Sequence, residues 1–133
     1  MRARMLALVA GLAMALAACG GGDTDGADDG ATGDAPVAEA GAATFVGNDS
    51  LQWSSAPAEA ELVDGALEVT IECDGAVPHN IVFEGVDDDA VLAECSGNDA
   101  ATATLTVDAG DYTYYCSIPG HREAGMEGQV TLN

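Results

Sequence analysis

The sequence has almost no positive charge. It contains no lysine and only three arginines against 23 aspartates and glutamates, which gives a formal net charge of −20 over 133 residues. A chain this acidic repels phosphate backbones, which excludes nucleic-acid binding driven by counterion release, and it disfavours anionic lipid headgroups. The length suits one domain of roughly 100 residues with a modest core, which excludes a multidomain enzyme.

Long apolar runs are absent except near the N-terminus. Arg2 and Arg4 precede an apolar run over residues 5–18, which is too short for a permanent membrane-spanning helix and has the layout of an export signal. The run ends in a Leu-Ala-Ala-Cys segment at Cys19, which resembles the lipobox of bacterial lipoproteins. The resemblance implies cleavage before Cys19 and acylation of that cysteine. An ordinary secretory signal with Cys19 incidental, and an uncleaved anchor, are the alternatives.

The segment after the signal offers almost nothing that a core can bury. Residues 19–43 consist mainly of glycine, alanine, aspartate and threonine. Such a segment cannot offset the entropy of ordering, so it is predicted to be a flexible acidic linker that reaches roughly 25–30 Å. The predicted organisation is a signal peptide over 1–18, a linker over 19–43 that starts at the lipidated Cys19, and one domain over 44–133. The exported domain would be anchored at the outer face of the cytoplasmic membrane or face the periplasm.

The predicted domain has the pattern of short strands. Leu67, Val69 and Ile71 alternate with Glu68 and Thr70, as in a strand with one buried face. Clear runs of this kind cover 67–73, 80–84, 102–107, 111–116 and 129–132, and weaker ones cover 44–46, 51–53 and 91–93. Turn residues separate the runs, and no segment has the period of a long helix. The pattern predicts an all-β sandwich.

Three metal-binding side chains lie close together near the C-terminus. Cys116, His121 and Met126 have the spacing Cys-x4-His-x4-Met on a predicted loop between two strands. The other histidine of the chain, His79, lies at the start of a predicted strand. One cysteine, two histidines and a weakly bound methionine are the donor set of a blue-copper electron-transfer centre. These four residues are therefore the candidate ligands of one copper ion.

Two segments of the sequence are typical of one protein family: a Pro-His-Asn segment that ends at Asn80 and a Tyr-x-Tyr-x-Cys strand that ends at Cys116. In both segments the sequence resembles the cupredoxin family of small blue-copper proteins. The resemblance covers residues 67–133 well and 44–66 loosely. Within the family, the ligand loop and the lipobox are most similar to membrane-tethered auracyanin- or halocyanin-like carriers, and the loop differs in length from the Cys-x2-His loop of plastocyanins. The resemblance implies a Greek-key β-sandwich that holds one type 1 copper, alternating between Cu(II) and Cu(I), with Met126 as the long axial ligand.

The same resemblance implies further roles for residues around the copper. The side chain of Asn80 would tie together the two loops that carry the ligands, and backbone amides near the cysteine sulfur would tune the potential. The edge of His121 would be the gateway for electrons, in an apolar patch with Ile118, Pro119 and Ala124.

Two cysteines remain once Cys19 is assigned to lipid and Cys116 to copper. In an exported protein this remaining pair, Cys73 and Cys95, favours a disulfide. The bridge would close a loop of about 20 residues and contribute roughly 3 kcal/mol to stability. The alternative is a second thiolate metal site, for which no free histidine remains.

The predicted function is the transfer of single electrons between redox partners, without bond chemistry. The acidic surface predicts a partner protein with a basic docking face, although the same acidity is also typical of adaptation to a salty milieu. Strong self-repulsion favours a monomer.

Two other functions remain open. An extracytoplasmic copper carrier would use the same ligands, but the Met-rich or His-rich tracts that favour delivery are absent from this chain. An Ig-like surface module without metal would require the ligand set to be coincidental. An enzyme with a second copper site needs more than the two histidines present, so the chain is not predicted to be an enzyme.

Overall fold

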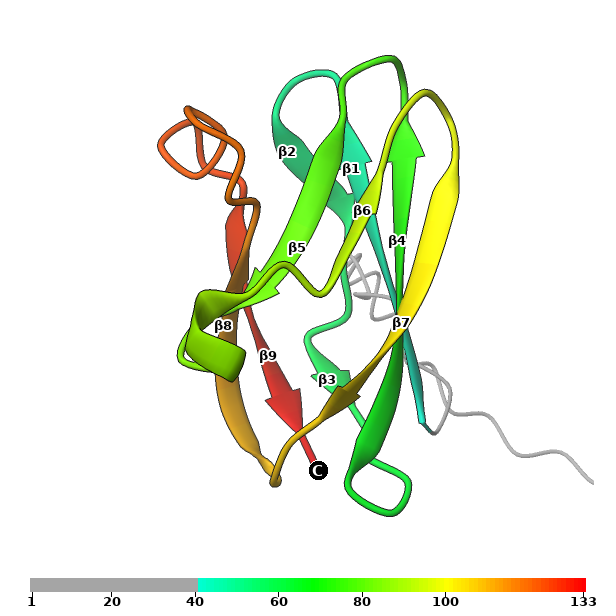
Figure 1. Cartoon of the computed structure of the whole chain (residues 1–133), viewed down its shortest axis with the longest axis vertical. Coiled ribbons are helices and arrows are strands. Elements are labelled where there is room, and N and C mark those ends of the chain that lie inside the picture. Colours follow the sequence, from blue (N-terminus) through cyan, green and yellow to red (C-terminus); the bar gives the residue numbers. More distant parts are fainter. Residues whose placement is uncertain (1–40) are drawn as a thin grey trace, which may run out of the picture. The chain divides into compact units, whose positions relative to one another are not determined.

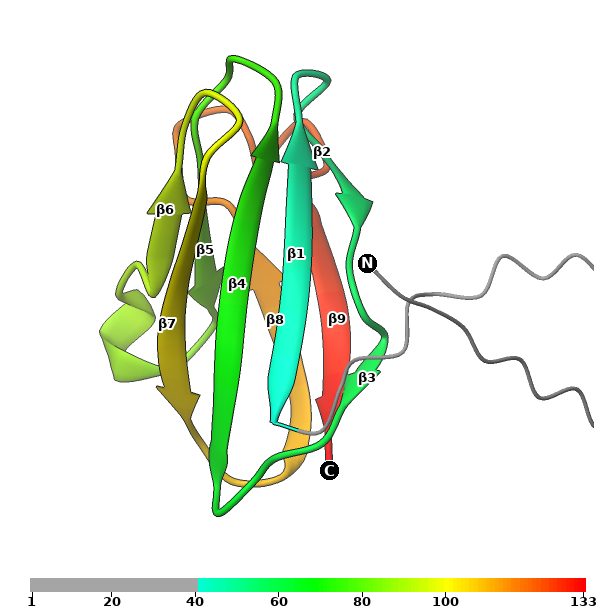
Figure 2. The same ribbon diagram turned by 90° about the vertical axis from the view of Figure 1, so that its right-hand side faces the viewer.

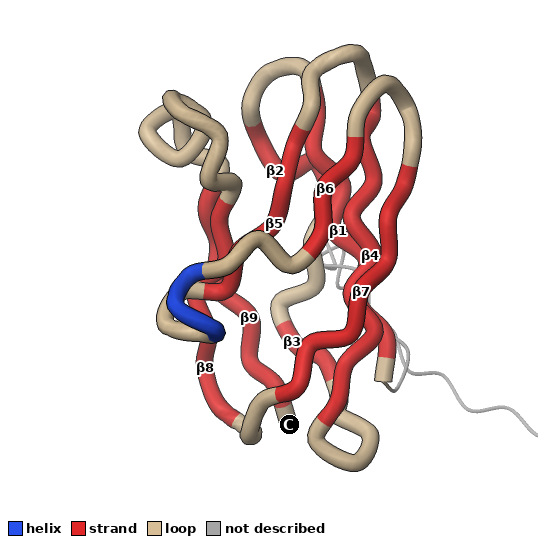
Figure 3. The backbone as a smooth tube through the Cα atoms, in the orientation of Figure 1, coloured by secondary structure: helices blue, strands red, loops and turns tan. Residues whose placement is uncertain are grey.

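The computed structural model describes residues 41–133, and strands make up most of this range (Figures 1 and 3). One short 3-10 turn, Asp87–Asp89 (η1), interrupts them. In chain order the strands are Ala42–Asn48 (β1), Gln52–Ser55 (β2), Glu59–Ala60 (β3), Ala66–Asp74 (β4), His79–Phe83 (β5), Ala93–Cys95 (β6), Ala100–Thr106 (β7), Gly110–Tyr115 (β8) and Glu127–Leu132 (β9). Over residues 41–133 no helix has the length and apolar character needed to cross a membrane.

The strands form two sheets that lie face to face (Figure 2). One sheet has the order β2-β1-β4-β7 and the other has the order β3-β9-β8-β5-β6. The pairs β1–β4 and β3–β9 are parallel, and the other pairs are antiparallel. Neighbouring strands in a sheet are often far apart in the chain, as in a Greek key. The all-β sandwich predicted from the sequence is confirmed.

The core lies between the two sheets. The apolar members of the alternating pattern in β4 are buried, and its polar members lie on the other face. Phe45 of β1 packs edge-on against Phe83 and Tyr114 of the opposite sheet, with ring centroids 6.0 and 4.7 Å apart. Burial of these apolar side chains holds the two sheets together.

Some strand boundaries differ from those that the pattern predicts. β1 begins at Ala42, inside the segment assigned to the linker, because its parallel pairing with β4 extends to Ala42 opposite Glu68. The two-residue strand β3 was not predicted, since two residues are too few to show alternation. β2 and β6 lie slightly C-terminal to the weak runs that indicated them.

Several loops meet at the end of the sandwich where β5 begins. The Asp49 carboxylate, in the β1–β2 loop, accepts a hydrogen bond from the N–H of Val77, before β5, at 2.9 Å. The side-chain oxygen of Asn98, in the β6–β7 loop, accepts one from the N–H of Gly75 at 3.1 Å. The β8–β9 loop, orange in Figure 1, lies at this end too. These contacts fix the loops around the site described next.

Candidate metal centre

His79 is the first residue of β5, a strand in which all five residues are buried. The preceding Pro78 has a fixed φ and restricts the residue before it to extended conformations, which suits the entry into a strand. Across the sheet His79 is paired with Cys95 of β6. The start of β5 therefore delivers the imidazole into the interior at the loop end of the sandwich.

The other sequence-predicted ligands come from the β8–β9 loop. Cys116 directly follows β8, and Met126 directly precedes β9. The N–H of Met126 donates to the His121 carbonyl at 3.0 Å, and the N–H of Cys116 donates to the Met126 carbonyl at 3.1 Å. Gly120 adopts a φ of 89°, which side chains other than glycine rarely tolerate, and so permits the turn directly before His121. Short-range hydrogen bonds thus return the loop to its starting point.

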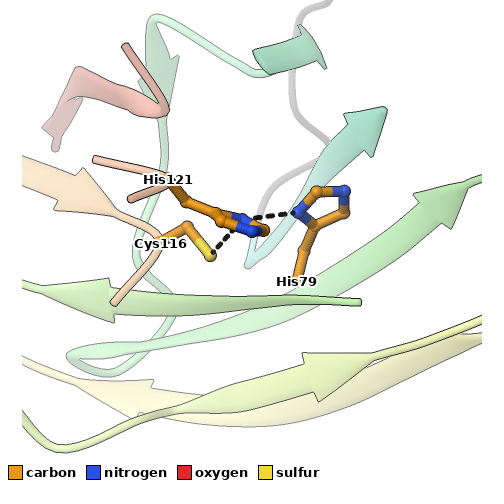
Figure 4. Close-up of side chains that lie close together, drawn as sticks. All are labelled: His79, Cys116 and His121. Carbon is orange, nitrogen blue, oxygen red and sulfur yellow. Dashed lines mark hydrogen bonds between the residues drawn. The ribbon is translucent and has the colours of Figure 1, made fainter. Parts of the chain in front are cut away.

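The two imidazoles and the thiol converge in the folded chain (Figure 4). His79 Nδ1 lies 3.3 Å from His121 Nδ1, and Cys116 Sγ lies 3.4 Å from His121 Nδ1. The three donor atoms all lie within 4.8 Å of one another. Exposure is 1% for His79, 0% for Cys116 and 7% for His121. The three metal-binding atoms therefore face one small region that is shielded from water.

Met126 lies against the same site, next to β1. Its side chain is fully buried. A Cβ built on Gly47 would lie 2.7 Å from the terminal methyl carbon of Met126 and 2.7 Å from Cδ2 of His79. Gly47 therefore marks the place where both side chains approach β1, and its lack of a side chain leaves them room.

The environment of His79 favours its neutral form. Burial lowers the pKa of His79 below its usual value of 6.5, and the neighbouring His121 lowers it further. The backbone of Asn48 and the charge of Asp49 oppose this shift. Neutral imidazole is the form that binds a metal, so the fold prepares His79 for ligation.

Asn80 connects the strand of His79 with the loop of Cys116. The backbone N–H of Ser117 donates to Asn80 Oδ1 at 2.7 Å, and Asn80 Nδ2 donates to Ser117 Oγ at 3.0 Å. The backbone N–H of Asn80 donates to Cys116 Sγ at 3.4 Å. A hydrogen bond of this kind stabilises a thiolate and tunes the reduction potential of the metal that the thiolate binds. Asn80 thus acts on the site through both its side chain and its backbone.

Residues 41–133 match the family described as copper binding proteins, plastocyanin/azurin family. The chain belongs to this family. It is a cupredoxin, as the motifs indicated. No curated protein sequence matches it significantly.

Solved cupredoxin structures share the fold. Dithionite-reduced auracyanin from Roseiflexus castenholzii is 21% identical, with a TM-score of 0.57 over 72% of this chain and 98% of its own. Auracyanin A, a blue copper protein from Chloroflexus aurantiacus, is 20% identical, with a TM-score of 0.54 over 69% of this chain and 98% of its own. An azurin from Methylomonas sp. strain J is 20% identical, with a TM-score of 0.52 over 69% of this chain and 97% of its own.

The donor set of this cupredoxin fits copper. Thiolate, thioether and imidazole are the ligands that copper prefers, and two histidines, one cysteine and a methionine are the set found in type 1 sites. His79, Cys116, His121 and Met126 have this arrangement. The cofactor is therefore one copper ion of type 1.

Two contacts near the site were not predicted from the sequence. The first is the approach of the ligands to Gly47. The second involves Arg122, whose guanidinium lies 4.0 Å above the ring of Tyr115 and donates to Glu84 at 2.9 Å and to Glu127. Both depend on which strand positions lie opposite each other, and the pairing of Tyr115 with Glu127 is not visible in the local pattern.

The remaining candidate residues are distributed as follows. Ile118 is half-buried, and Pro119 and Ala124 are exposed on the loop that carries His121. Cys73 and Cys95 form a disulfide. Cys19 lies outside the described residues.

Proposed function

We propose that this cupredoxin is a membrane-tethered electron carrier whose copper is held by His79, Cys116, His121 and Met126. The observation that carries the proposal is the convergence of two Nδ1 atoms and one Sγ atom in a buried site, with Met126 beside them. Copper bound there would accept and release one electron. The chain contains two histidines, and both lie in this site, which leaves none for a second copper site of the kind found in copper enzymes.

The residues around the ligands hold them in place. Backbone hydrogen bonds fix both ends of the β8–β9 loop, and the Asn80 amide fixes that loop to β5. A pre-organised ligand set changes little between oxidation states, which favours fast electron transfer over metal release. Burial of all four side chains excludes water from the metal.

The proposed exit for electrons is the edge of His121. It is the most exposed of the four proposed ligands. Ile118, Pro119 and Ala124 on the same loop would give a partner protein a mainly uncharged contact area around this edge.

The proposed partner is a redox protein with a basic docking face. Arg122 is the only lysine or arginine after residue 4, and both of its salt bridges are to acidic side chains of the same chain. Within residues 41–133, no lysine or arginine is therefore left without a carboxylate partner. Steering by opposite charge raises the association rate and weakens as salt increases.

Tethering through Cys19 is the third part of the proposal. The Leu-Ala-Ala-Cys segment supports export and acylation, and residues 19–43 are long enough to hold the domain away from the bilayer. In a bacterial host, Cys19→Ser should move the protein from the membrane to the soluble fraction. A wild-type chain whose mature N-terminus carries no lipid by mass spectrometry would contradict this part.

Electron transfer is tested by repeated reduction and oxidation of the copper-loaded protein in the presence of a Cu(I) chelator. We expect a reversible one-electron couple and retention of the copper through many cycles. Glu123→Gln, at an exposed position of the same loop, serves as the control and should behave as the wild type. Transfer of the metal to the chelator at the first reduction would instead favour a copper carrier.

Docking is tested by following electron transfer to a basic and to an acidic haem protein of similar potential. We expect the rate with the basic partner to be higher and to fall as salt increases. Equal rates with both partners at low salt would contradict the docking proposal.

A further inference from the structure

The disulfide of this protein lies beside the metal centre and joins the two sheets. Cys73 belongs to β4 in one sheet and Cys95 to β6 in the other, and their Cα atoms are 5.7 Å apart. Both cysteines are buried. The bridge therefore crosses the core at the end of the sandwich that holds the proposed ligands.

Each half of the disulfide lies opposite a residue of the site. Cys95 is the cross-strand partner of His79 in the β5–β6 pair. Cys73 is the partner of Gly47 in the β1–β4 pair. Gly47 in turn faces the His79 ring and the Met126 methyl group, since a Cβ there would lie 2.7 Å from each. A closed circuit of contacts thus links Gly47, Cys73, Cys95 and His79. It consists of two strand pairings, one disulfide and the packing of His79 against Gly47.

The start of β5 has few other backbone supports. The pairing of β5 with β8 covers Val82 and Phe83 only, so within its sheet the His79 end of β5 is paired with β6 alone. β6 is a three-residue edge strand. The disulfide cross-links this edge strand to β4 of the opposite sheet, and the short β6–β7 connection joins it to β7 of that sheet. The Asn80 side chain, bonded to Ser117, supports the next residue from the other side.

A hollow in the protein surface lies next to this circuit. This hollow of about 520 Å³ is lined by residues that include Pro78, His79, Cys95 and Ile118. If β6 were released from β4, β6 and the His79 end of β5 would have room to shift towards this hollow.

We propose that the Cys73–Cys95 disulfide is a positioning element of the copper site, because it holds His79 against Gly47 and Met126. The inference rests on the proposed ligation by His79. It assigns to the bridge a role beyond the stability that any cross-link supplies: loss of the bridge alters the His79 side of the site and leaves the Cys116–His121 loop in place.

The test compares the Cys73→Ala/Cys95→Ala double variant with Leu105→Ala. Leu105 is buried in the core, on a strand that provides none of the proposed ligands, so its replacement lowers stability without touching the circuit. In the copper-free proteins, NMR signals of the two histidine rings report on position without any metal. We expect the His79 signals to shift or broaden in the double variant while those of His121 remain, and neither to change in Leu105→Ala.

The copper-loaded proteins provide the second readout. We expect the double variant to lose about tenfold or more in copper affinity and to show altered visible and electron paramagnetic resonance spectra. Unchanged His79 signals in a folded double variant, together with wild-type copper spectra, would overturn the proposal. If the copper-free rings respond as expected but neither wild type nor variant binds copper, the proposed function fails and the positioning role of the bridge stands.

Two further measurements cover the case in which the double variant does not fold. Reduction of the wild-type disulfide in the copper-free folded protein should produce the same change in the His79 signals. Gly47→Ala keeps the disulfide but places a methyl group against His79 and Met126, and should perturb the copper spectra from the opposite side of the circuit. His79 signals that stay unchanged when the disulfide is reduced would equally overturn the proposal.

Discussion

The two halves of the metal centre are built in different ways. Cys116, His121 and Met126 come from one loop, which is closed by hydrogen bonds between residues close together in the chain. His79 is the first residue of β5, which is paired there with β6, and the disulfide joins β6 to the opposite sheet. The loop half is therefore local, and the His79 half depends on the whole sandwich.

This difference shows that one small domain can position its metal ligands by two kinds of contact. Short-range hydrogen bonds order the loop with little cost in chain entropy, whereas the position of His79 requires long-range contacts to be formed first. The Asn80 amide joins the two halves. Substitutions in the loop half and in the His79 half should therefore differ in how much stability they cost and in which property of the site they change.

The largest effect is expected from a core substitution under the His79 half. Ile81 of β5 is fully buried, so Ile81→Ala should lower the free energy of unfolding by about 3 kcal/mol through lost burial and a cavity. Ile118→Ala in the loop half, where the side chain is half-buried, should cost under about 1 kcal/mol. Denaturant unfolding of both copper-free variants measures the contrast, and equal losses would remove the distinction between the two halves.

A smaller effect is expected from separating the halves at Asn80. Asn80→Ala removes the hydrogen bonds to Ser117 and should lower the free energy of unfolding by about 1–2 kcal/mol, with a shift of the copper spectrum. Ser117→Ala keeps the bond between the Ser117 N–H and Asn80 Oδ1, so it should have a smaller effect on both. A larger loss of unfolding free energy in Ser117→Ala than in Asn80→Ala would contradict the assignment of the link to the Asn80 amide.

The pH dependence of the copper-free protein should report on His79. Its pKa is lowered in the folded state, so below pH 6.5 the unfolded chain binds a proton that the folded protein does not. The free energy of unfolding should therefore fall as the pH falls from above 6.5, with a slope of at most about 1.4 kcal/mol per pH unit from this group. The contribution of His79 is the difference between the pH profiles of unfolding free energy of the wild type and His79→Gln. Identical profiles for the two proteins would refute this contribution.

The smallest effect is expected at Arg122, on the surface of the loop half. Arg122→Gln removes the salt bridges to Glu84 and Glu127 and the contact with the Tyr115 ring. Exposed ion pairs contribute little and are screened by salt, so the loss in melting temperature should be small and should shrink as salt increases. The control is Glu123→Gln, a charge change on the same loop. A loss that grows with salt would contradict this assignment.

The local half of the site was predictable from the sequence, and the other half only in part. The spacing of Cys116, His121 and Met126 and the alternation in 67–73 are visible in neighbouring residues, so they predicted the ligand loop and a central strand. His79 was found because the chain has only two histidines. The approach of Gly47 and the pairing of Cys95 with His79 were not predicted, because they depend on the register of strands that are distant in the sequence.

Cys116 and its three partners are proposed to hold one copper in a type 1 site. Visible and electron paramagnetic resonance spectra of the Cu(II)-loaded protein, compared with those of Cys116→Ser, test this claim most directly, because Cys116 is the only free cysteine in residues 41–133. We predict an intense thiolate-to-copper charge-transfer band in the wild type that disappears in the variant. A colourless wild-type protein with Cu(II) bound, or a band that survives in Cys116→Ser, would contradict the claim.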